Sequence, residues 1–116
     1  YNYIKNNKLE SSGSSITEGI GTSRITKNFE KAMVDIAFQT DDNEALEIVY
    51  NLIEDQQIVL GGSSGINIAG AIKLAKELGP GKNIVTILCD DGRRYASKIF
   101  NKKFLIEKKL PIPKWL

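Results

Sequence analysis

Residues 57–65 read Gln-Ile-Val-Leu-Gly-Gly-Ser-Ser-Gly and connect a short apolar run to a helical pattern. The run 57–60 has the length and composition of a strand, and the paired glycines end it sharply. The residues that define one apolar face of the following helix are Ile68, Ala71, Ile72, Ala75 and Leu78. The stretch therefore predicts a strand, a glycine-serine turn and an amphipathic helix.

A second strand and helix are predicted before this turn. Residues 34–38 alternate apolar and polar side chains, as a short strand does. Asp41 can cap a helix, and Glu44 three residues later gives nearly a capping box. Apolar residues at helical spacing continue this pattern, so we expect the helix to run to about Glu54.

The pattern of elements continues after the turn. Gly79-Pro80-Gly81 ends the second helix, and residues 84–89 form a continuous apolar run. Such a run is typical of a strand that a parallel sheet buries on both faces. After a turn at residues 90–92, a short helix is expected over residues 95–100. The alternation of strands and helices predicts the α/β class with a mostly parallel sheet.

Composition excludes several classes of function. The chain has 116 residues, a net charge of +2, no histidine and one cysteine. Catalytic triads, His-ligated metals, cysteine clusters and internal disulfides are therefore excluded, so no metal site is expected. Mixed charges argue against a nucleic-acid partner, and the apolar runs are too short to span a membrane. We expect a cytoplasmic protein.

The turn Gly61–Gly65 is the strongest candidate for a ligand site. Glycines allow the backbone to approach a ligand, amides at a helix start favour anions, and serine hydroxyls can donate or accept hydrogen bonds. The turn matches neither a Walker loop nor a GxGxxG motif. A tight packing turn with a serine cap is the alternative interpretation.

Three motifs in order resemble those of cysteine synthases. They are residues 13–21, residues 60–67 and residues 87–95, and the ending 104–116 resembles that of one bacterial subgroup. These enzymes, also called O-acetylserine sulfhydrylases, are fold-type II pyridoxal-phosphate enzymes, as is cystathionine β-synthase. The resemblance implies a partial three-layer α/β/α domain like the tryptophan synthase β subunit. Residues 1–116 are then expected to be the C-terminal portion of the catalytic domain.

The resemblance also implies roles for individual residues. Ser63 matches the serine that hydrogen-bonds the pyridine nitrogen of the cofactor, and Gly62 before it is also assigned to the cofactor. A neutral hydroxyl does not enforce a protonated ring as a carboxylate would, which suits β-elimination. Asp90 is expected near the pyridine edge, and Tyr95 is expected mainly to pack.

Residues 18–21 match the family loop that lines the cofactor and substrate pocket. Gly19 and Ile20 are assigned to the cofactor, and Glu18 and Gly21 to the substrate pocket. Glu18 is as well explained by anchoring the loop.

Two positions depart from the family pattern, because Cys89 replaces a proline and Asp91 replaces a serine. We expect Cys89 to be a buried thiol rather than a nucleophile. Arg93-Arg94 are expected to have a surface or salt-bridge role rather than to bind phosphate, since the family's phosphate loop has no match here.

The implied reaction is β-replacement with pyridoxal phosphate as the cofactor, which converts O-acetylserine and sulfide to cysteine and acetate. No lysine lies in a motif that matches the Schiff-base lysine, so no catalytic residue is assigned and this chain alone is expected to be inactive. The resemblance implies a homodimer. The alternatives are cystathionine synthesis from serine and homocysteine, a non-catalytic module that binds a phosphate ligand, and a split enzyme.

Overall fold

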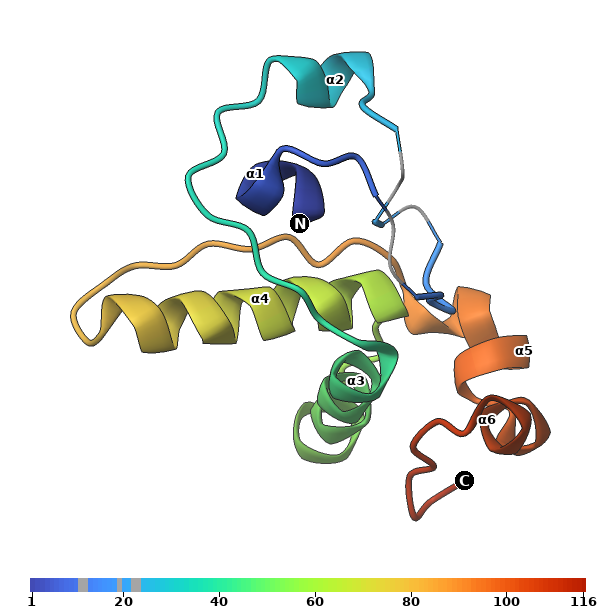
Figure 1. Ribbon diagram of the computed structural model, residues 1–116. Coiled ribbons are helices and arrows are strands. Elements are labelled where there is room, and N and C mark those ends of the chain that lie inside the picture. Colours follow the sequence, from blue (N-terminus) through green and yellow to red (C-terminus); the bar gives the residue numbers. More distant parts are fainter. Residues whose placement is uncertain (11–12, 19, 22–23) are drawn as a thin grey trace.

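The regular structure of the chain is helical. The computed structural model describes residues 1–10, 13–18, 20–21 and 24–116. The helices, of which η1 is a 3₁₀ helix, are α1 Asn2–Asn6, α2 Lys27–Glu30, α3 Asp42–Gln56, α4 Gly62–Leu78, η1 Gly92–Tyr95, α5 Ala96–Ile99 and α6 Lys102–Lys108. Figure 1 shows α3 and α4 crossing each other, with α1 and α2 on one side and α5 and α6 near the start of α4.

Helix α3 confirms the helix predicted from Asp41. The Asp41 carboxylate accepts a hydrogen bond of 2.9 Å from the backbone N–H of Glu44. The Glu44 carboxylate binds Lys73 of α4 at 2.7 Å, so it stabilises the packing of two helices rather than completing a capping box. The helix ends at Gln56, two residues beyond the predicted end.

Helix α4 confirms the second helix but begins earlier than predicted. The glycine-serine turn is itself the first helical turn, because the N–H groups of Ser64 and Gly65 both donate to the carbonyl of Gly61. Gly61 is the N-cap residue, with an extended backbone. The helix ends as predicted at Gly79, which has a φ of 75°.

Close packing of α3 and α4 depends on Gly65. A Cβ atom at Gly65 would lie 2.3 Å from the carbonyl oxygen of Ala45, which is far too close for non-bonded atoms. Ala45, Val49 and Ala69 are fully buried. Gly65 is therefore needed for the contact between the helix backbones, whatever ligand the turn binds.

The hydrophobic core joins α3 to the C-terminal helices. Its buried members are Leu46, Val49, Tyr50, Ile99 and Leu105. The hydroxyl of Tyr50 donates a hydrogen bond of 2.7 Å to the carbonyl of Ile99, and burial raises the pKa of Tyr50 to about 12. Trp115 packs edge-on against the Tyr50 ring at 5.8 Å.

The short helix predicted over residues 95–100 begins earlier and in another form. The 3₁₀ helix η1 precedes α5, and Asp91 caps it by accepting a hydrogen bond of 2.9 Å from the N–H of Arg93. Asp91, the residue that departs from the family pattern, thus stabilises the start of this helix.

The segments predicted as strands form no β-ladder among the described residues. The pairing there is one antiparallel bridge between Leu60 and Asp91. The N–H of Gly61 donates to Asp90 at 2.9 Å, and that of Gly92 donates to Val59 at 3.1 Å. A strand is stabilised by its neighbours, and the described residues supply none for segments 34–38 and 84–89.

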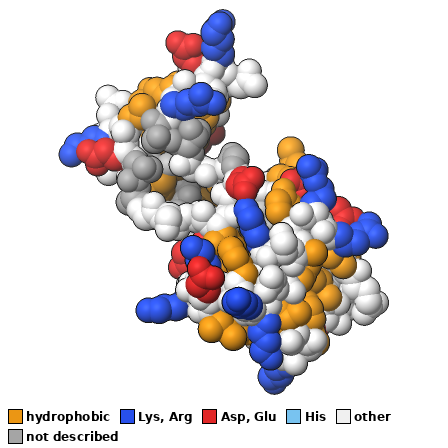
Figure 2. Space-filling model, turned by 90° about the vertical axis from the view of Figure 1, so that its right-hand side faces the viewer, with side chains coloured by type: hydrophobic (Ala, Val, Ile, Leu, Met, Phe, Trp, Pro, Cys, Tyr) orange, Lys and Arg blue, Asp and Glu red, His pale blue; other side chains and the backbone are white. Residues whose placement is uncertain are grey.

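Segment 84–89 runs beside α4, as Figure 1 shows for the chain that follows this helix. Asn67 of α4 donates a hydrogen bond of 2.9 Å to the carbonyl of Ile87. Contrary to the prediction, the apolar side chains are not covered: Val85 is 93% exposed and Ile87 71% exposed. The thiol of Cys89, expected to be buried, is also exposed. Figure 2 shows hydrophobic side chains spread over the face it presents.

Candidate functional site

The two serines at the start of α4 have different environments. Ser64 is fully buried, and its hydroxyl accepts a hydrogen bond of 2.9 Å from the backbone N–H of Cys89. Ser63 is half-buried, and its hydroxyl makes no hydrogen bond among the residues that the structure describes. Ser64 is thus committed to the fold, whereas Ser63 remains available to a ligand.

Ser63 faces a small recess of about 10 Å³. Its lining includes Thr17, Glu18, Gly62, Ser63, Tyr95 and Lys98. The recess holds at most a water-sized group and cannot enclose a pyridine ring. A ring bound through Ser63 would therefore have to lie largely outside the recess.

Gly62 is where segment 13–18 approaches α4. A Cβ atom at Gly62 would lie 2.8 Å from the Thr17 hydroxyl oxygen. The packing-turn interpretation therefore holds for Gly62 and Gly65, while the ligand interpretation fits the free hydroxyl of Ser63. The two interpretations apply to different residues of one turn.

Glu18 lies at the recess but is held by a partner. Its carboxylate binds the Lys98 ammonium of α5 at 2.5 Å. The hydrogen bond from Lys98 and its positive charge lower the pKa of Glu18, which keeps this carboxyl group ionised. This geometry favours the loop-anchoring interpretation of Glu18.

Asp90 and Tyr95 form a hydrogen-bonded pair beside the recess. The Tyr95 hydroxyl donates to the Asp90 carboxylate at 2.5 Å, and this hydrogen bond raises the pKa of Tyr95. Tyr95 lines the recess with Ser63, whereas Asp90 does not. Asp90 is joined to the recess through Tyr95, and its backbone carbonyl accepts a hydrogen bond from the N–H of Gly61.

Arg93 and Arg94 form the salt bridges expected of them. Arg93 binds Asp91 at 2.5 Å, and Arg94 binds Asp90 at 3.4 Å. The hydrogen bonds from Arg93 lower the pKa of Asp91 to about 2. Both guanidinium groups are thus paired with carboxylates.

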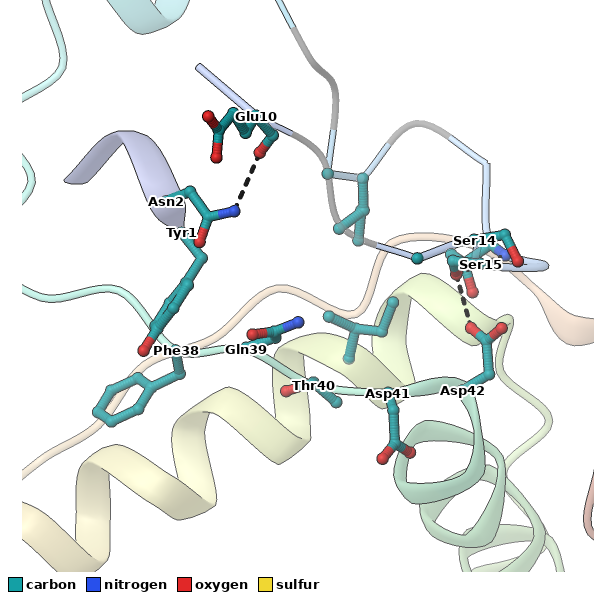
Figure 3. Close-up of a pocket in the computed structure, with 15 residues that line it drawn as sticks. Tyr1, Asn2, Glu10, Ser14, Ser15, Phe38, Gln39, Thr40, Asp41 and Asp42 are labelled. Atoms are coloured by element: carbon teal, nitrogen blue, oxygen red, sulfur yellow. Dashed lines mark hydrogen bonds between the residues drawn. The ribbon is translucent and has the colours of Figure 1, made fainter. Parts of the chain in front are cut away.

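A larger cavity of about 540 Å³ lies on the other side of segment 13–18. Ile20 and Gly21 line it, and Thr17 lines both this cavity and the recess. Figure 3 shows its opposite side, where residues 38–42 lead into α3. Glu18, Gly62 and Ser63 thus line the recess, Ile20 and Gly21 line the larger cavity, and Asp90 lines neither. Gly19 lies outside the described residues.

Sequence reasoning missed Lys98. Tyr95 packs against the core as expected, and its hydroxyl in addition binds Asp90. Tyr95 and Lys98 are three positions apart, so one turn of η1 and α5 brings both toward Ser63. The three-residue spacing of Tyr95 and Lys98 was the only local signal for a role of Lys98 at the site, since Glu18, the partner of Lys98, lies 80 residues away.

Two classes of site are not found in the described part of the chain. No group of His, Cys, Asp or Glu residues there could hold a metal ion. No helix there is both long and apolar enough to cross a membrane.

Comparison with known proteins gives one consistent result. Residues 2–90 match the family model for pyridoxal-phosphate dependent enzymes. A cysteine synthase of Dictyostelium discoideum is 45% identical over 91 residues, which are 78% of this chain and 24% of that protein. Cysteine synthase 1 of Neurospora crassa is 42% identical over 104 residues, which are 88% of this chain and 28% of that protein.

A related enzyme matches less closely. Rat cystathionine beta-synthase is 37% identical over 91 residues, 78% of this chain and 16% of that protein. The chain spans about a quarter of the length of the cysteine synthases it matches. The family match covers most of the chain, including the turn at Ser63. The chain belongs to the family of pyridoxal-phosphate dependent enzymes.

Proposed function

We propose that this chain forms the C-terminal portion of the catalytic domain of a cysteine synthase, which converts O-acetylserine and sulfide to cysteine and acetate. The observation that carries the proposal is the uncommitted hydroxyl of Ser63 at the first turn of α4, beside a serine that is fully committed. Similarity to proteins named cysteine synthase, at 41% to 45% identity, supports this choice of reaction.

Ser63 fits one edge of the cofactor ring. Pyridoxal phosphate supplies the electron-withdrawing chemistry of such enzymes when it is bound. The Ser63 hydroxyl can hydrogen-bond the ring nitrogen, and as a neutral group it does not force that nitrogen to remain protonated. Gly62 leaves room for Thr17 at this edge.

The chain's own residues provide no lysine for cofactor attachment at this edge. Lys98, the lysine among the described residues that line the recess, uses its ammonium group to bind Glu18 at 2.5 Å. We therefore place the attachment lysine in another part of the protein, which would complete the site around Ser63.

The uncovered apolar segment suggests how the domain is completed. Ile87 and its neighbours in segment 84–89 have the composition of a strand buried on two faces, yet Val85 is 93% exposed. We propose that further strands of the protein pair with segments 34–38, 57–60 and 84–89 in a mostly parallel sheet. The homodimer and the cytoplasmic location remain predictions from the family resemblance.

Replacing the serine tests the proposal. In the full-length protein, we expect Ser63→Ala to lower cysteine production from O-acetylserine and sulfide by about 2- to 10-fold, the value of one neutral hydrogen bond. Cofactor affinity, followed by absorbance of the bound cofactor, should fall as well. Ser97→Ala, an exposed serine of α5, is the matched control and should change neither.

Unchanged activity and cofactor affinity in Ser63→Ala would contradict the role of Ser63. A full-length wild-type protein that binds no pyridoxal phosphate and makes no cysteine would contradict the function.

Cystathionine synthesis is the second candidate, favoured by the similarity to rat cystathionine beta-synthase. The same protein is assayed with serine and homocysteine in place of O-acetylserine and sulfide. Higher kcat/KM with serine and homocysteine would replace the first proposal by the second.

A further inference from the structure

Segment 13–18 connects three helices across the start of α4. Its first attachment is to α3, where the two carboxylate oxygens of Asp42 accept separate hydrogen bonds. The hydroxyl of Ser15 donates to one at 2.6 Å, and the backbone N–H of Ile16 donates to the other at 2.8 Å. Figure 3 shows the contact between Ser15 and Asp42. Two hydrogen bonds to one charged group fix this end of the segment firmly.

The middle of the segment lies against α4. The N–H of Thr17 donates to the Ser15 hydroxyl at 3.0 Å, which turns the chain toward the helix. The Thr17 side chain then reaches the backbone at Gly62, next to Ser63. The position of Thr17 therefore determines how open the recess at Ser63 is.

The far end of the segment is attached only by charge among the described contacts. Glu18 binds Lys98 of α5 at 2.5 Å, with the Glu18 side chain 76% exposed and that of Lys98 35% exposed. Lys98 also lines the recess with Ser63. An exposed ion pair is weak and is screened by salt, unlike the bidentate contact at Asp42.

We infer that Lys98 is a positioning residue: by pairing with Glu18 it holds segment 13–18 closed against the Ser63 turn. Its effect on catalysis rests on the proposed function, whereas its effect on the segment does not. Lys98 contacts no reacting atom in this role. Salt weakens the pair, so the segment opens at the Glu18 end while the Asp42 end stays attached.

Hydrogen exchange in the full-length protein tests the effect on the segment. Lys98→Met should speed exchange of the amides of Thr17 and Glu18 and leave that of Ile16, which donates to Asp42, nearly unchanged. Lys98→Arg, which keeps the charge, should retain the wild-type rates. Arg93→Met is the matched control, because it removes another exposed ion pair of 2.5 Å, Arg93–Asp91, away from the segment. Unchanged exchange in Lys98→Met, or equal acceleration in Arg93→Met, would overturn the inference.

Kinetics tests the effect on the site. Lys98→Met should raise the KM for O-acetylserine by about two- to fivefold with a smaller change in kcat, as expected for an exposed pair. Rising salt should raise the wild-type KM toward that of Lys98→Met and leave the variant's KM nearly constant. Lys98→Arg should restore the wild-type values. A lower Tm with unchanged KM would assign Lys98 a merely structural role and overturn the inference.

Hydrogen exchange and kinetics together distinguish a failure of the proposed function from a failure of the inference about Lys98. If the wild-type protein makes no cysteine, the proposed function fails, and hydrogen exchange alone decides the role of Lys98. If cysteine is made but exchange and KM are the same in Lys98→Met and wild type, the function stands and the inference about Lys98 falls.

Discussion

Different interactions stabilise the two regions of the molecule, residues 42–116 and residues 1–40. Every fully buried side chain that the structure describes lies in the first region, in α3, α4, α5 or α6. In the described part of residues 1–40, no residue is buried, and α1 and α2 have only five and four residues. Helices this short need tertiary contacts to persist.

The second region is attached to the first by polar contacts and by Ile16, which packs against the hydrophobic core. Asp42 holds Ser15 and Ile16, Lys98 holds Glu18, and Lys73 donates a hydrogen bond of 2.6 Å to the carbonyl of Gln39. The comparison teaches that the scaffold carrying Ser63 is hydrophobic and fixed, whereas the segments that line the two cavities depend on charge and hydrogen bonds. Substitutions in the two regions should therefore differ in size and in salt dependence.

The largest effect is expected in the core, at Leu105. This side chain is fully buried, so Leu105→Ala leaves a cavity among α3, α5 and α6 and should lower the free energy of unfolding by about 2 to 5 kcal/mol. Urea unfolding measures this loss. Leu9→Ala, a half-exposed leucine of the other region, is the control, and an equal loss there would erase the distinction between the regions.

The second-largest loss of stability is expected for Gly65→Ala. Its Cβ would lie 2.3 Å from the carbonyl oxygen of Ala45, so α3 and α4 must move apart, at a cost of about 1 to 3 kcal/mol. Gly70→Ala in the same helix has no atom within 4 Å and should instead stabilise the protein by about 0.5 to 1 kcal/mol. Thermal unfolding compares the two variants, and a change of the same sign in both would contradict the packing role of Gly65.

Tyr50→Phe should have a smaller effect that depends on pH. Losing the hydrogen bond to Ile99 should cost about 1 kcal/mol at neutral pH. In the wild type, burial raises the Tyr50 pKa from 10.0 to about 12. The unfolded state then loses its proton first, and wild-type stability from this group falls as pH rises from 10 to 12.

The Tyr50→Phe variant has no ionisable hydroxyl at this position, so the gap in stability between wild type and variant should narrow over that pH range. Urea unfolding at several alkaline pH values measures the gap, and a gap that widens would show that the tyrosinate is stabilised in the fold.

The smallest effect is expected in residues 1–40, at Gly21. Its φ of 74° is unfavourable for residues with a side chain, but nothing lies within 4 Å of its Cβ position. Gly21→Ala should lower the free energy of unfolding by about 1 kcal/mol, the cost of the backbone conformation alone. Gly21→Asn should lose less, because asparagine tolerates this conformation, and thermal unfolding ranks the two. A loss larger than that of Gly65→Ala would show that residues 1–40 are packed more tightly than their exposure indicates.

The helices could be predicted because their signals are local. Asp41 and the apolar spacing after it indicated α3, and Gly79 marked the end of α4. The start of α4 was missed, because Gly62 and Ser63 have turn propensity although their backbone is helical here. Tertiary contacts overrode the local preference.

The predicted strands and site depended on information that is not local. Segment 84–89 has the composition of an interior strand, but pairing requires neighbouring strands that the described residues do not supply. Ser63 could be identified through the family resemblance. Lys98 could not, because its contact with Glu18 joins residues 80 positions apart and neither belongs to a pattern that indicates the other.

The sequence by itself determined the position of α3 and of α4 beyond its first turn, the exclusion of histidine and cysteine-cluster chemistry, and membership of the pyridoxal-phosphate dependent family. Capping, glycine dihedrals and apolar spacing act within a few residues, so a single chain segment is enough to show them. Only the tertiary structure decided that Ser64 is committed to Cys89 while Ser63 stays available, and that Lys98 meets Glu18. Burial and charge pairing depend on which segments, distant in sequence, come into contact, and the tertiary packing of the chain determines those contacts.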